Sequence, residues 1–477
     1  MSRKLYITTS IPYVNSRPHL GFALELVQAE VIARYHHLGG VPTHFQTGTD
    51  ENAFKNVLAA RARGLATQDL VDANAALFRR LAEALNISND VFIRTTDPAH
   101  ARGVHRFWKS LQSDDLYRRQ YTGLYCVECE DFYLARDLVH GCCPDHGIPP
   151  VEVQEENWFF RLSAYQDRLE RLISEGQIEI LPESRRNEVL SFIRRGLNDI
   201  SISRAAERCG GWGIRVPGDE SQIIYVWIDA LINYISGLGY GQSENWGNWW
   251  DHETVKTHVI GKNVWKFHAI YWPALLLSAG LSLPDRIVVH GFLTEDGRKI
   301  SKSSGATIDP FNCIGCYGAD GVRYYLLRAV SPFEDSDVSL DRLQSLYNAD
   351  LANGLGNLVS RLHTLWQRTG GQHSVLPSVS TAPEGYHDAL ASCEFDQALK
   401  QLWESVTQVN REIERSQPWR ALREDRPDAI RGDLQRWRGV LNSLAYWLAP
   451  FLPQASQKIQ QGLSAAVGAG KVLFPRH

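Results

Sequence analysis

The sequence predicts an α/β domain built on a parallel sheet, followed by an all-helical domain. Short apolar runs alternate with amphipathic helical patterns in the first part of the chain, as where the strand pattern Lys4–Thr9 precedes a helical run that ends near His37. From Ser339 onward, apolar residues recur every three or four positions, which is the helical period. A chain of 477 residues exceeds what one core usually holds, so we expect more than one domain.

Composition and charge limit the classes of protein to which the chain can belong. Its 50 basic and 54 acidic residues leave a net charge of −4, so any contact with RNA has to rest on local basic patches and not on an overall basic field. Hydrophobic residues make up 44% of the chain, but no apolar run reaches the length of a membrane span. We therefore expect a cytoplasmic protein that does not enter a membrane.

Residues 1–115 are predicted to form the first half of the α/β domain. The strand Lys4–Thr9 leads to the turn Pro18-His19-Leu20-Gly21, after which the helical pattern begins. The first amide groups of a helix and its dipole favour an anion at such a turn. His19 can donate to a phosphate there, and Gly21 lets a ligand approach the backbone.

A second polar residue follows the next predicted strand. That strand, Pro42–Thr47, runs into Gly48-Thr-Asp50-Glu51, and amphipathic helices follow from Ala53. Ligands of parallel α/β sheets collect outside the carboxyl ends of the strands. Both Asp50 and the helix-opening turn are expected at that edge of the sheet.

The pattern breaks over residues 116–153, where potential metal ligands are clustered. These are Cys126, Cys129, Cys142, Cys143 and His146. The first two cysteines are three positions apart, and a later cysteine with the histidine supplies a second pair, as in a tetrahedral zinc site. Cys142 and Cys143 compete for the second pair, and buried free thiols are the alternative. Cys313 and Cys316 have the same spacing without a second pair, fall in an expected helix, and are interpreted as structural.

Residues 154–325 are predicted to complete the sheet. Three apolar runs are interpreted as buried strands: Ile223–Trp227, Thr257–Ile260 and Arg286–His290. The last run leads into the loop Asp296–Gly305, in which Lys299 and Lys302 stand among glycines and serines. Flexible ammonium groups can follow the negative charge of a triphosphate, although an ordinary exposed turn has the same composition.

Residues 326–477 are predicted to be helical. The apolar period runs from Leu340 to Leu365, and Pro377–Pro383 is expected to be a connection. Helices are then predicted over about 385–415 and 428–465. These segments predict an antiparallel helical bundle.

Two stretches of the chain, taken together, resemble the two signatures of class I aminoacyl-tRNA synthetases. They are His19-Leu-Gly21 and Lys299-Ile-Ser-Lys302-Ser, about 280 residues apart. Further sequence segments resemble the methionyl-tRNA synthetase family over nearly the whole chain. They are Ile11-Pro-Tyr-Val-Asn15, Thr47-Gly-Thr-Asp-Glu51, Tyr225–Tyr234, His258-Val-Ile-Gly-Lys262 and Phe267–Pro273. The resemblance implies a Rossmann-type class I synthetase catalytic domain with a zinc-knuckle insertion, followed by an all-α domain of the anticodon-binding type.

The resemblance also implies a reaction. An amino acid, with methionine favoured, would be activated by ATP through an aminoacyl adenylate and transferred to the 3′ end of tRNA, with Mg²⁺ sharing the phosphate charge. The positions that match the catalytic and ATP-binding residues of the family are His19, Gly21, Lys299 and Lys302, joined for ATP binding by Gly261 and Asn263.

The resemblance implies three further sets of residues. The amino-acid pocket would consist of Ile11, Tyr13, Asp50, Trp227, Leu231, Tyr234 and His268, with Asp50 on the ammonium group, although each aromatic taken singly is more readily explained by core packing. The anticodon would be read by Asn357, Arg361 and Trp419, for which a solvated helix face and bundle packing are the alternatives. A structural Zn²⁺ would be held by Cys126, Cys129, Cys143 and His146, because Cys-Pro-x-His matches the single-knuckle form.

Three residues depart from the pattern of the family. Phe22 stands in place of a histidine in the first signature, Asn52 replaces a histidine after Asp50, and Asn263 replaces an aspartate. These departures indicate a retuned nucleotide site, since charge-assisted bonds are about twice as strong as neutral ones. The alternative function is therefore a paralogue that adenylates an amino acid and passes it to a small N-hydroxylated amine, with a cupin partner. A non-catalytic RNA-binding protein is disfavoured, because both signatures are present.

Overall fold

The computed structural model describes most of the chain, in the form of two units. The described residues are 3–126, 131–133, 135, 138–144, 147–295, 297–299, 308–370, 378–464 and 472–477, with only the backbone described at 131, 132, 298 and 299. The first unit comprises residues 1–18, 41–80 and 89–289, and the second comprises 19–40, 81–88 and 290–477.

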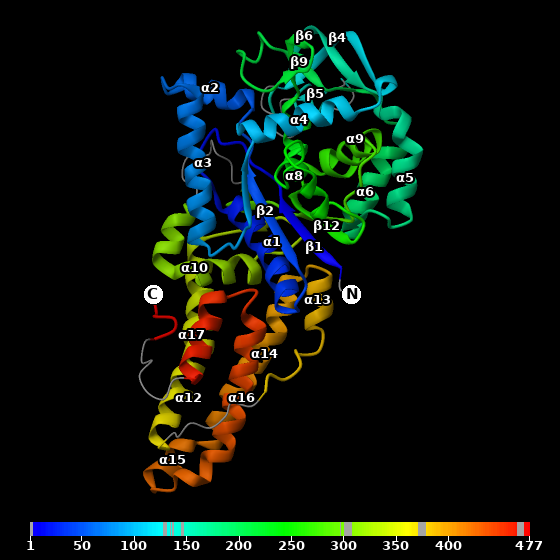
Figure 1. Ribbon diagram of the computed structural model, residues 1–477. Helices are drawn as coiled ribbons and strands as arrows, with labels where there is room; N and C mark the ends of the chain where they lie inside the picture. The colour runs from blue at the N-terminus through cyan, green and yellow to red at the C-terminus, as the bar shows by residue number, and fades with distance from the viewer. Residues whose placement is uncertain are drawn as a thin grey trace. The chain divides into compact units, whose positions relative to one another are not determined.

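A six-stranded sheet forms the centre of the first unit (Figure 1). Its strand order is β3 (Val91–Arg94), β2 (Thr43–Thr49), β1 (Lys4–Thr9), β12 (Thr254–Gly261), β13 (Arg286–His290) and β7 (Glu179–Leu181). The pairs β1 with β2, β1 with β12, β2 with β3 and β13 with β7 are parallel. The chain proceeds from β1 toward β2 on one side and later toward β12 on the other, so the strand order reverses beside β1. In open α/β sheets, ligands bind at the carboxyl ends of the strands at this position.

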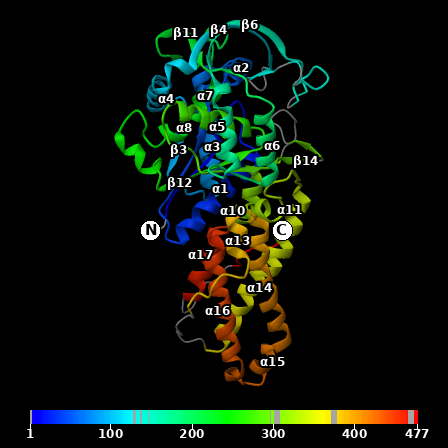
Figure 2. The same cartoon turned by 90° about the vertical axis from the view of Figure 1, so that its right-hand side faces the viewer.

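Helices and an apolar core support this sheet. The helices of the first unit are α2 (Phe54–Ala62), most of α3 (Thr67–Ala84), α4 (Pro98–Ser110), α5 (Gln166–Ser174), α6 (Glu183–Arg194), α7 (Val226–Leu231), α8 (Asn233–Ser236) and α9 (Trp272–Ser278). Helices α5 and α6 lie side by side, as Figure 2 shows. One continuous cluster of buried side chains extends from Tyr6 in β1 to Trp272 in α9 and includes Trp250 and Phe107. Burial of this apolar area fixes the helices on the sheet.

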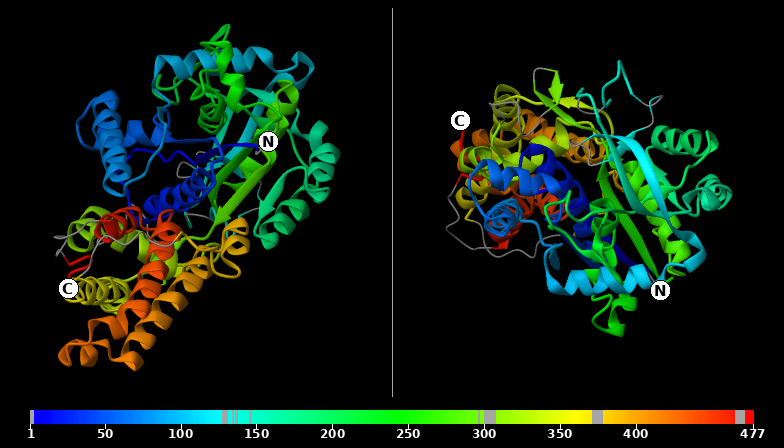
Figure 3. Two further views of the ribbon diagram at one scale, coloured as in Figure 1. Left: turned by 60° about the horizontal axis from the view of Figure 1, so that its bottom comes forward. Right: turned by 90° about the horizontal axis from the view of Figure 1, so that it is seen from above.

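The predicted insertion forms an antiparallel sheet. Strand β4 (Leu116–Cys126) pairs with β6 (Val151–Phe160) along nearly its full length, and β5 (Asp131–Tyr133) and β8 (Ile200–Ser201) lie at the two edges. By the colour bar of Figure 3, β4 is drawn in cyan and its antiparallel partner β6 in teal. A smaller antiparallel sheet contains β9 (Ser203–Ala205), β10 (Arg215–Val216) and β11 (Asp219–Ile224).

The sequence-based strand predictions hold for β1, β2, β12 and β13, but one is wrong. The run Ile223–Trp227 was expected to be a strand of the parallel sheet, whereas β11 ends at Ile224 in the small antiparallel sheet and Trp227 lies in α7. A short apolar run fits a strand and a buried helix equally well, so periodicity alone could not decide. The edge strand β7 was not predicted, because three residues are too few to show the alternation of apolar and polar side chains that indicates a strand.

The second unit is mainly helical, as predicted from Ser339 onward. Its helices are α1 (Leu20–Leu38), α10 (Pro310–Arg328), α11 (Leu340–Leu346), a π-helical segment (Tyr347–Gly356), α12 (Asn357–Arg368), α13 (Tyr386–Ala391), α14 (Phe395–Ser416), α15 (Pro418–Arg423), α16 (Arg431–Leu448) and α17 (Pro453–Ser464). Helices α14 and α16 pack against each other, as Figures 1 and 2 show. Strands β14 (Leu293–Glu295), β15 (Arg298–Lys299) and β16 (Ser336–Asp337) form a small sheet.

The helical boundaries differ from the prediction at three breaks. The segment predicted over 385–415 is divided at Cys393, and α14 ends at Ser416, directly before Gln417. Cys393 and Gln417 have positive φ angles, of 57° and 47°. The segment predicted over 428–465 is divided at Pro450, which cannot continue the hydrogen-bond pattern of α16. Within the described ranges, none of the helices combines the length and the apolar character needed to span a bilayer.

Candidate functional site

The turn that opens α1 has the geometry of a capped helix N-terminus. His19 is the N-cap, with extended φ and ψ angles of −124° and 173°, and its Nδ1 accepts a hydrogen bond of 3.0 Å from the amide of Gly21. Since Nδ1 is the acceptor, the proton of the neutral ring lies on Nε2, the nitrogen that can donate to a ligand. A Cβ at residue 21 would lie only 2.9 Å from the imidazole ring, so glycine is needed there for this capped geometry. Binding of a phosphate at this turn remains a prediction.

Phe22, which replaces a histidine of the family pattern, is buried in the second unit. Its amide donates to the carbonyl of His19 at 3.1 Å, so the backbone enters the helix normally. One turn further along α1, the buried carboxylate of Glu25 lies 2.9 Å from Nε2 of His290. The first turns of α1 therefore carry an apolar ring and a buried acid–imidazole pair beside the proposed phosphate contact.

Asp50 follows β2 at the carboxyl edge of the sheet. Its amide donates to the carbonyl of Pro12 at 2.9 Å, and its backbone pairs in parallel with Tyr13, so the two segments stay adjacent beyond the ends of β1 and β2. Its side chain is 1% exposed. Two residues earlier, a Cβ at Gly48 would lie 2.1 Å from the carbonyl oxygen of Ile93, so glycine allows β2 and β3 to approach. The prediction that Asp50 lies at this edge is confirmed.

Aromatic residues predicted for the amino-acid pocket are brought together in the same unit. The ring of Trp227 lies 5.6 Å from that of Tyr13 and stacks on Phe267 at 4.1 Å with an interplanar angle of 6°. The hydroxyl of Tyr234 lies 2.6 Å from Nε2 of His268. Phe267 was not predicted as a pocket residue, although it directly precedes His268; its apolar character gave no signal distinct from core packing.

The two apolar residues of the predicted pocket also lie in this unit. Ile11 is buried against Ile93 and Ala230, and Leu231 is buried in α7 as part of the main core. Ala230 and Leu231 belong to the same helix as Trp227. The predicted pocket residues thus come from the segment after β1, the end of β2, helices α7 and α8, and the π-helical turn Phe267–Tyr271.

His268 is held as a neutral imidazole with a fixed tautomer. Burial lowers the pKa of His268 to about 4. Its Nδ1 donates to the carbonyl of Val264 at 3.0 Å, so Nε2 accepts from Tyr234. Burial, with the nearby His268 and Lys256, also lowers the pKa of His258, whose ring lies 4.2 Å from that of Tyr234. His258 and His268 are therefore both uncharged near neutral pH.

This burial predicts a loss of stability in mild acid. The pKa of His268 is about 4 in the folded protein against about 6.5 when unfolded, so the unfolded state binds more protons in this interval and stability falls as pH drops below 6.5. We expect His268 to contribute a loss of about 2 kcal/mol between pH 6.5 and 5. Urea unfolding of the wild type and of His268→Gln at both pH values measures this, and equal pH slopes for the two proteins would contradict it.

Gly261 and Asn263 lie at the carboxyl end of β12, the strand beside β1. Gly261 is the buried last residue of the strand, and the amide of Val264 donates to its carbonyl at 3.1 Å to form a turn. Asn263 lies on this turn and is exposed. This is the position that the reversal of strand order favours for a ligand.

The lysine loop is described only at its beginning. Gly297, with φ of 72°, forms a hairpin in which the backbone of Lys299 pairs with Thr294. Lys302 lies outside the described residues, and the side chain of Lys299 is not described. Their contact with phosphate stays a prediction.

Half of the predicted zinc ligands can be located. Cys126, at the end of β4, and Cys143 are both buried, whereas Cys129 and His146 lie outside the described residues. Cys143 occupies a tight turn, since its carbonyl accepts from Gly147 and its amide donates to Ile148, both at 2.8 Å. Among the described residues, no three potential ligands form a metal cluster. Both located cysteines are buried, and metal binding stays a prediction.

The three predicted anticodon residues lie in the helical unit. Asn357 opens α12, and Arg361, one turn later, lies 3.4 Å from Glu414 of α14 in a surface ion pair. Trp419 is half-buried in α15, which packs against α12, and the preceding Pro418 is buried. Partial exposure leaves Trp419 able both to pack and to stack on a base.

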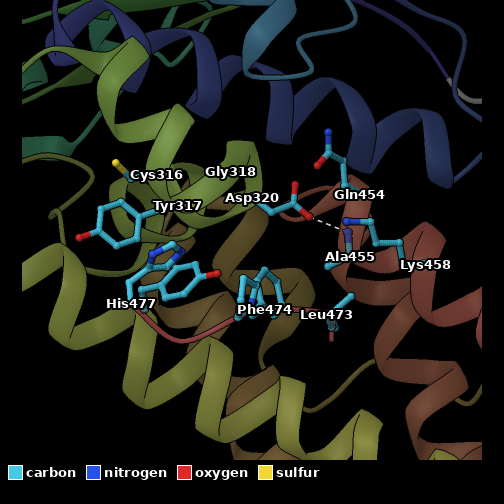
Figure 4. A pocket seen from close by; sticks show the side chains of 12 residues that line it. Cys316, Tyr317, Gly318, Asp320, Gln454, Ala455, Lys458, Leu473, Phe474 and His477 are labelled. Carbon is cyan, nitrogen blue, oxygen red and sulfur yellow. Dashed lines mark hydrogen bonds between the residues drawn. The ribbon is translucent and has the colours of Figure 1, made fainter. Parts of the chain in front are cut away.

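A cavity of about 190 Å³ lies in the helical unit, lined by residues of α10, α17 and the C-terminal segment. Asp320 points toward the start of α17, where its carboxylate accepts a 2.6 Å hydrogen bond from the amide of Ala455 (Figure 4). Burial raises the pKa of Asp320. The carboxylate thus caps α17, and none of the residues predicted for catalysis, amino-acid binding or the anticodon lines this cavity. Cys313 and Cys316 both lie in α10, the helix expected for them.

The chain is similar to known proteins over nearly its whole length. The model of the family tRNA synthetases class I (M) matches residues 5–149 and 146–363. A methionine–tRNA ligase of Brucella suis is 40% identical, covering 99% of this chain and 94% of the relative, and one of Thermotoga maritima is 38% identical, covering 97% and 75%.

Solved structures give the same result. The structure of Mycobacterium tuberculosis methionyl-tRNA synthetase in complex with methionyl-adenylate is similar with a TM-score of 0.89 and 36% identity, covering 96% of this chain and 93% of that one. The free form of the same enzyme gives a TM-score of 0.83 at 31% identity, covering 100% and 99%.

Proposed function

Since the chain belongs to the class I methionyl-tRNA synthetase family, we propose that it activates methionine with ATP and transfers it to the 3′ end of tRNA. The observation that supports this proposal is that Tyr13 pairs with Asp50 and lies against Trp227, and that Tyr234 lies against His268 in the same unit. Relatives that cover nearly the whole chain are methionine–tRNA ligases, and a similar structure holds methionyl-adenylate.

The pocket supports an amino acid with an uncharged, apolar side chain. Asp50 supplies the buried carboxylate that an α-ammonium group needs. Stacked Trp227 and Phe267 offer flat apolar surface, and the neutral Tyr234–His268 pair offers a polar contact without charge. A thioether is polarisable, makes favourable contacts with aromatic rings and accepts only weak hydrogen bonds, so it suits this wall.

Activation requires no nucleophilic side chain. A carboxylate oxygen of methionine forms a bond to the α-phosphorus of ATP, and the bond from that phosphorus to pyrophosphate breaks. We assign His19, Gly21 and the N-terminus of α1 to the phosphates, Lys299 and Lys302 to the leaving pyrophosphate, and Gly261 and Asn263 to the nucleoside. Mg²⁺, when bound, supplies counter-charge to the phosphates.

Zn²⁺ is assigned to Cys126, Cys129, Cys143 and His146. The buried thiols of Cys126 and Cys143 fit thiolate ligands of a closed tetrahedral site. The role is structural, because four protein ligands leave no open position for substrate. The site would fix the antiparallel insertion and not take part in the chemistry.

Transfer to tRNA is favoured over the small-acceptor alternative. The relatives named above are tRNA ligases, and no observation favours an N-hydroxylated amine acceptor or a cupin partner. The departures at Phe22, Asn52 and Asn263 are accommodated: Phe22 and Asn52 are buried and Asn263 is exposed on a turn. They are compatible with a normal fold of the activation site.

Exchange of labelled pyrophosphate into ATP, run with each standard amino acid, tests the proposal. Exchange that depends on methionine, followed by charging of tRNA, is the expected result. Exchange with another amino acid, or product only with hydroxylated lysine as acceptor, would overturn it.

Replacing Trp419 by alanine should separate activation from transfer. Loss of a stacked base costs about 1–3 kcal/mol, so we expect tRNA charging to fall by roughly 5-fold to 150-fold while methionine-dependent exchange is unchanged. Trp419→Phe, which keeps a stacking ring, is the control. Unchanged charging together with early melting would show that Trp419 serves packing only.

A further inference from the structure

A buried chain of hydrogen bonds begins at Asn52, two residues after Asp50. The side-chain amide of Asn52 donates to Oδ2 of Asp229 at 2.7 Å and to the carbonyl of Thr95 at 3.0 Å. Its backbone amide donates to Oδ1 of Asp50 at 3.3 Å. Asn52 thus connects the loop that carries the ammonium-binding carboxylate with Asp229 of α7.

The chain continues from Asp229 to α8. The second oxygen of Asp229, Oδ1, lies 2.6 Å from Nε2 of His100, and Nδ1 of the same ring lies 2.7 Å from Oγ of Ser236. All four side chains are buried, with exposed fractions of 9% for Asn52, 0% for Asp229, 1% for His100 and 3% for Ser236. Both oxygens of a fully buried carboxylate are therefore satisfied by directional partners.

Asp229 stands between two residues of the pocket wall. Trp227 and Leu231 lie two positions before and after it in α7, and Tyr234 follows in α8. Because consecutive helical residues are 100° apart, fixing the rotation of α7 at Asp229 fixes where these side chains point. Bonds to Asn52 and His100 supply that fixed rotation.

Burying a carboxylate is costly, and well-packed apolar residues often stabilise a helix contact as well or better. Directional hydrogen bonds, unlike apolar packing, hold the loop that carries Asp50 and helix α7 in one defined relative position. Asp50 binds the ammonium end of the substrate and α7 carries the wall for its side chain. The distance between these two features decides which amino acid fits.

We infer that Asn52, Asp229 and His100 form a positioning network that sets the place of α7 relative to Asp50 and thereby the affinity for methionine. These are positioning residues, since they act through Asp50 and the α7 side chains. The inference rests on the proposed function. Asn52 departs from the family pattern, and the sequence alone indicated a change in nucleotide binding. The network instead gives Asn52 a role in amino-acid binding.

The variant Asn52→Leu tests this, because leucine has a similar size and no donor. We expect the KM for methionine in pyrophosphate exchange to rise by about 10-fold or more, because one buried carboxylate oxygen of Asp229 loses its hydrogen-bond donor. The KM for ATP should change by less than about 2-fold. Asn52→His restores an N–H donor toward Asp229 and should return the methionine KM to within about 3-fold of the wild type. Ser278→Ala, which removes a buried hydrogen bond to Asp115 elsewhere in the unit, is the control and should change neither KM.

The outcomes separate the inference from the proposed function. A lower melting temperature of Asn52→Leu with both KM values unchanged, or no rescue by Asn52→His, overturns the network. If the wild type exchanges with another amino acid, the proposed function fails, and the same comparison of KM values for that amino acid still decides the network. No exchange with any amino acid overturns both.

Discussion

Replacing Asp50 by asparagine is expected to lower kcat/KM for methionine activation by about 100-fold to 1,000-fold. Asp50 is 1% exposed and its backbone is bonded to Pro12 and paired with Tyr13, so it is held at the carboxyl end of β2. Removing one partner of a buried charge pair costs 2–5 kcal/mol, and each 1.4 kcal/mol is a factor of ten. Asparagine keeps the size of the side chain and removes the charge that an ammonium group requires. Methionine-dependent pyrophosphate exchange measures the effect.

A carboxylate at the other edge of the sheet serves as the control. Asp251 forms a 3.3 Å ion pair with Lys4, at the start of β1, and Asp251→Asn should leave kcat/KM unchanged within about 2-fold because partly exposed pairs contribute little. If Asp50→Asn also leaves the KM for methionine unchanged, Asp50 does not bind the ammonium group, and the pocket must be assigned to other residues.

Replacing Arg323 by methionine is expected to destabilise the helical unit by about 3–5 kcal/mol. Arg323 is fully buried in α10 and donates to the carbonyls of Phe451, Pro450 and Leu85 at 2.7, 2.9 and 3.2 Å. Burial lowers the pKa of Arg323 to about 10, so the group stays charged near neutral pH. Methionine fills a similar space but leaves three carbonyl oxygens without these donors.

Urea unfolding followed by circular dichroism measures this loss. The matched control is Arg431→Met, which removes an exposed arginine paired with Asp428 and should change the free energy of unfolding by less than about 0.5 kcal/mol. A loss of less than about 1 kcal/mol for Arg323→Met would show that water or shifted backbone groups satisfy the carbonyls.

The parts of the fold that the sequence predicted are those with strong local signals. Strand β1 is a short run of strand-forming residues around Leu5, Tyr6 and Ile7, and the helical period from Leu340 is regular over several turns. His19 was placed correctly because a strand, a turn with glycine and a helix follow each other within a few residues. The run Ile223–Trp227 failed, since its few apolar residues lie across the junction of β11 and α7.

The parts of the site that could not be predicted depend on partners far away in the chain. From the sequence, Asn52 indicates the loss of a polar contact to the nucleotide. In the structure, its side-chain amide donates a hydrogen bond to Asp229, 177 residues later. The stacking of Phe267 on Trp227, 40 residues earlier, likewise becomes visible only in the folded chain. Neither pairing leaves a local pattern, because hydrogen bonds and ring stacking between distant segments do not impose a period on the sequence.

The strand order of the central sheet also has a consequence during synthesis. Lys4 of β1 pairs with Thr254 of β12, so one edge of β1 stays open until about 250 more residues have been translated. At about 5–20 residues per second this interval lasts roughly 12–50 s. Throughout it, the nascent chain presents an apolar strand with unpaired backbone groups, which is a template for pairing with other chains. The stretch of synthesis between β1 and β12 is therefore the interval in which this strand edge is open to pairing with other chains.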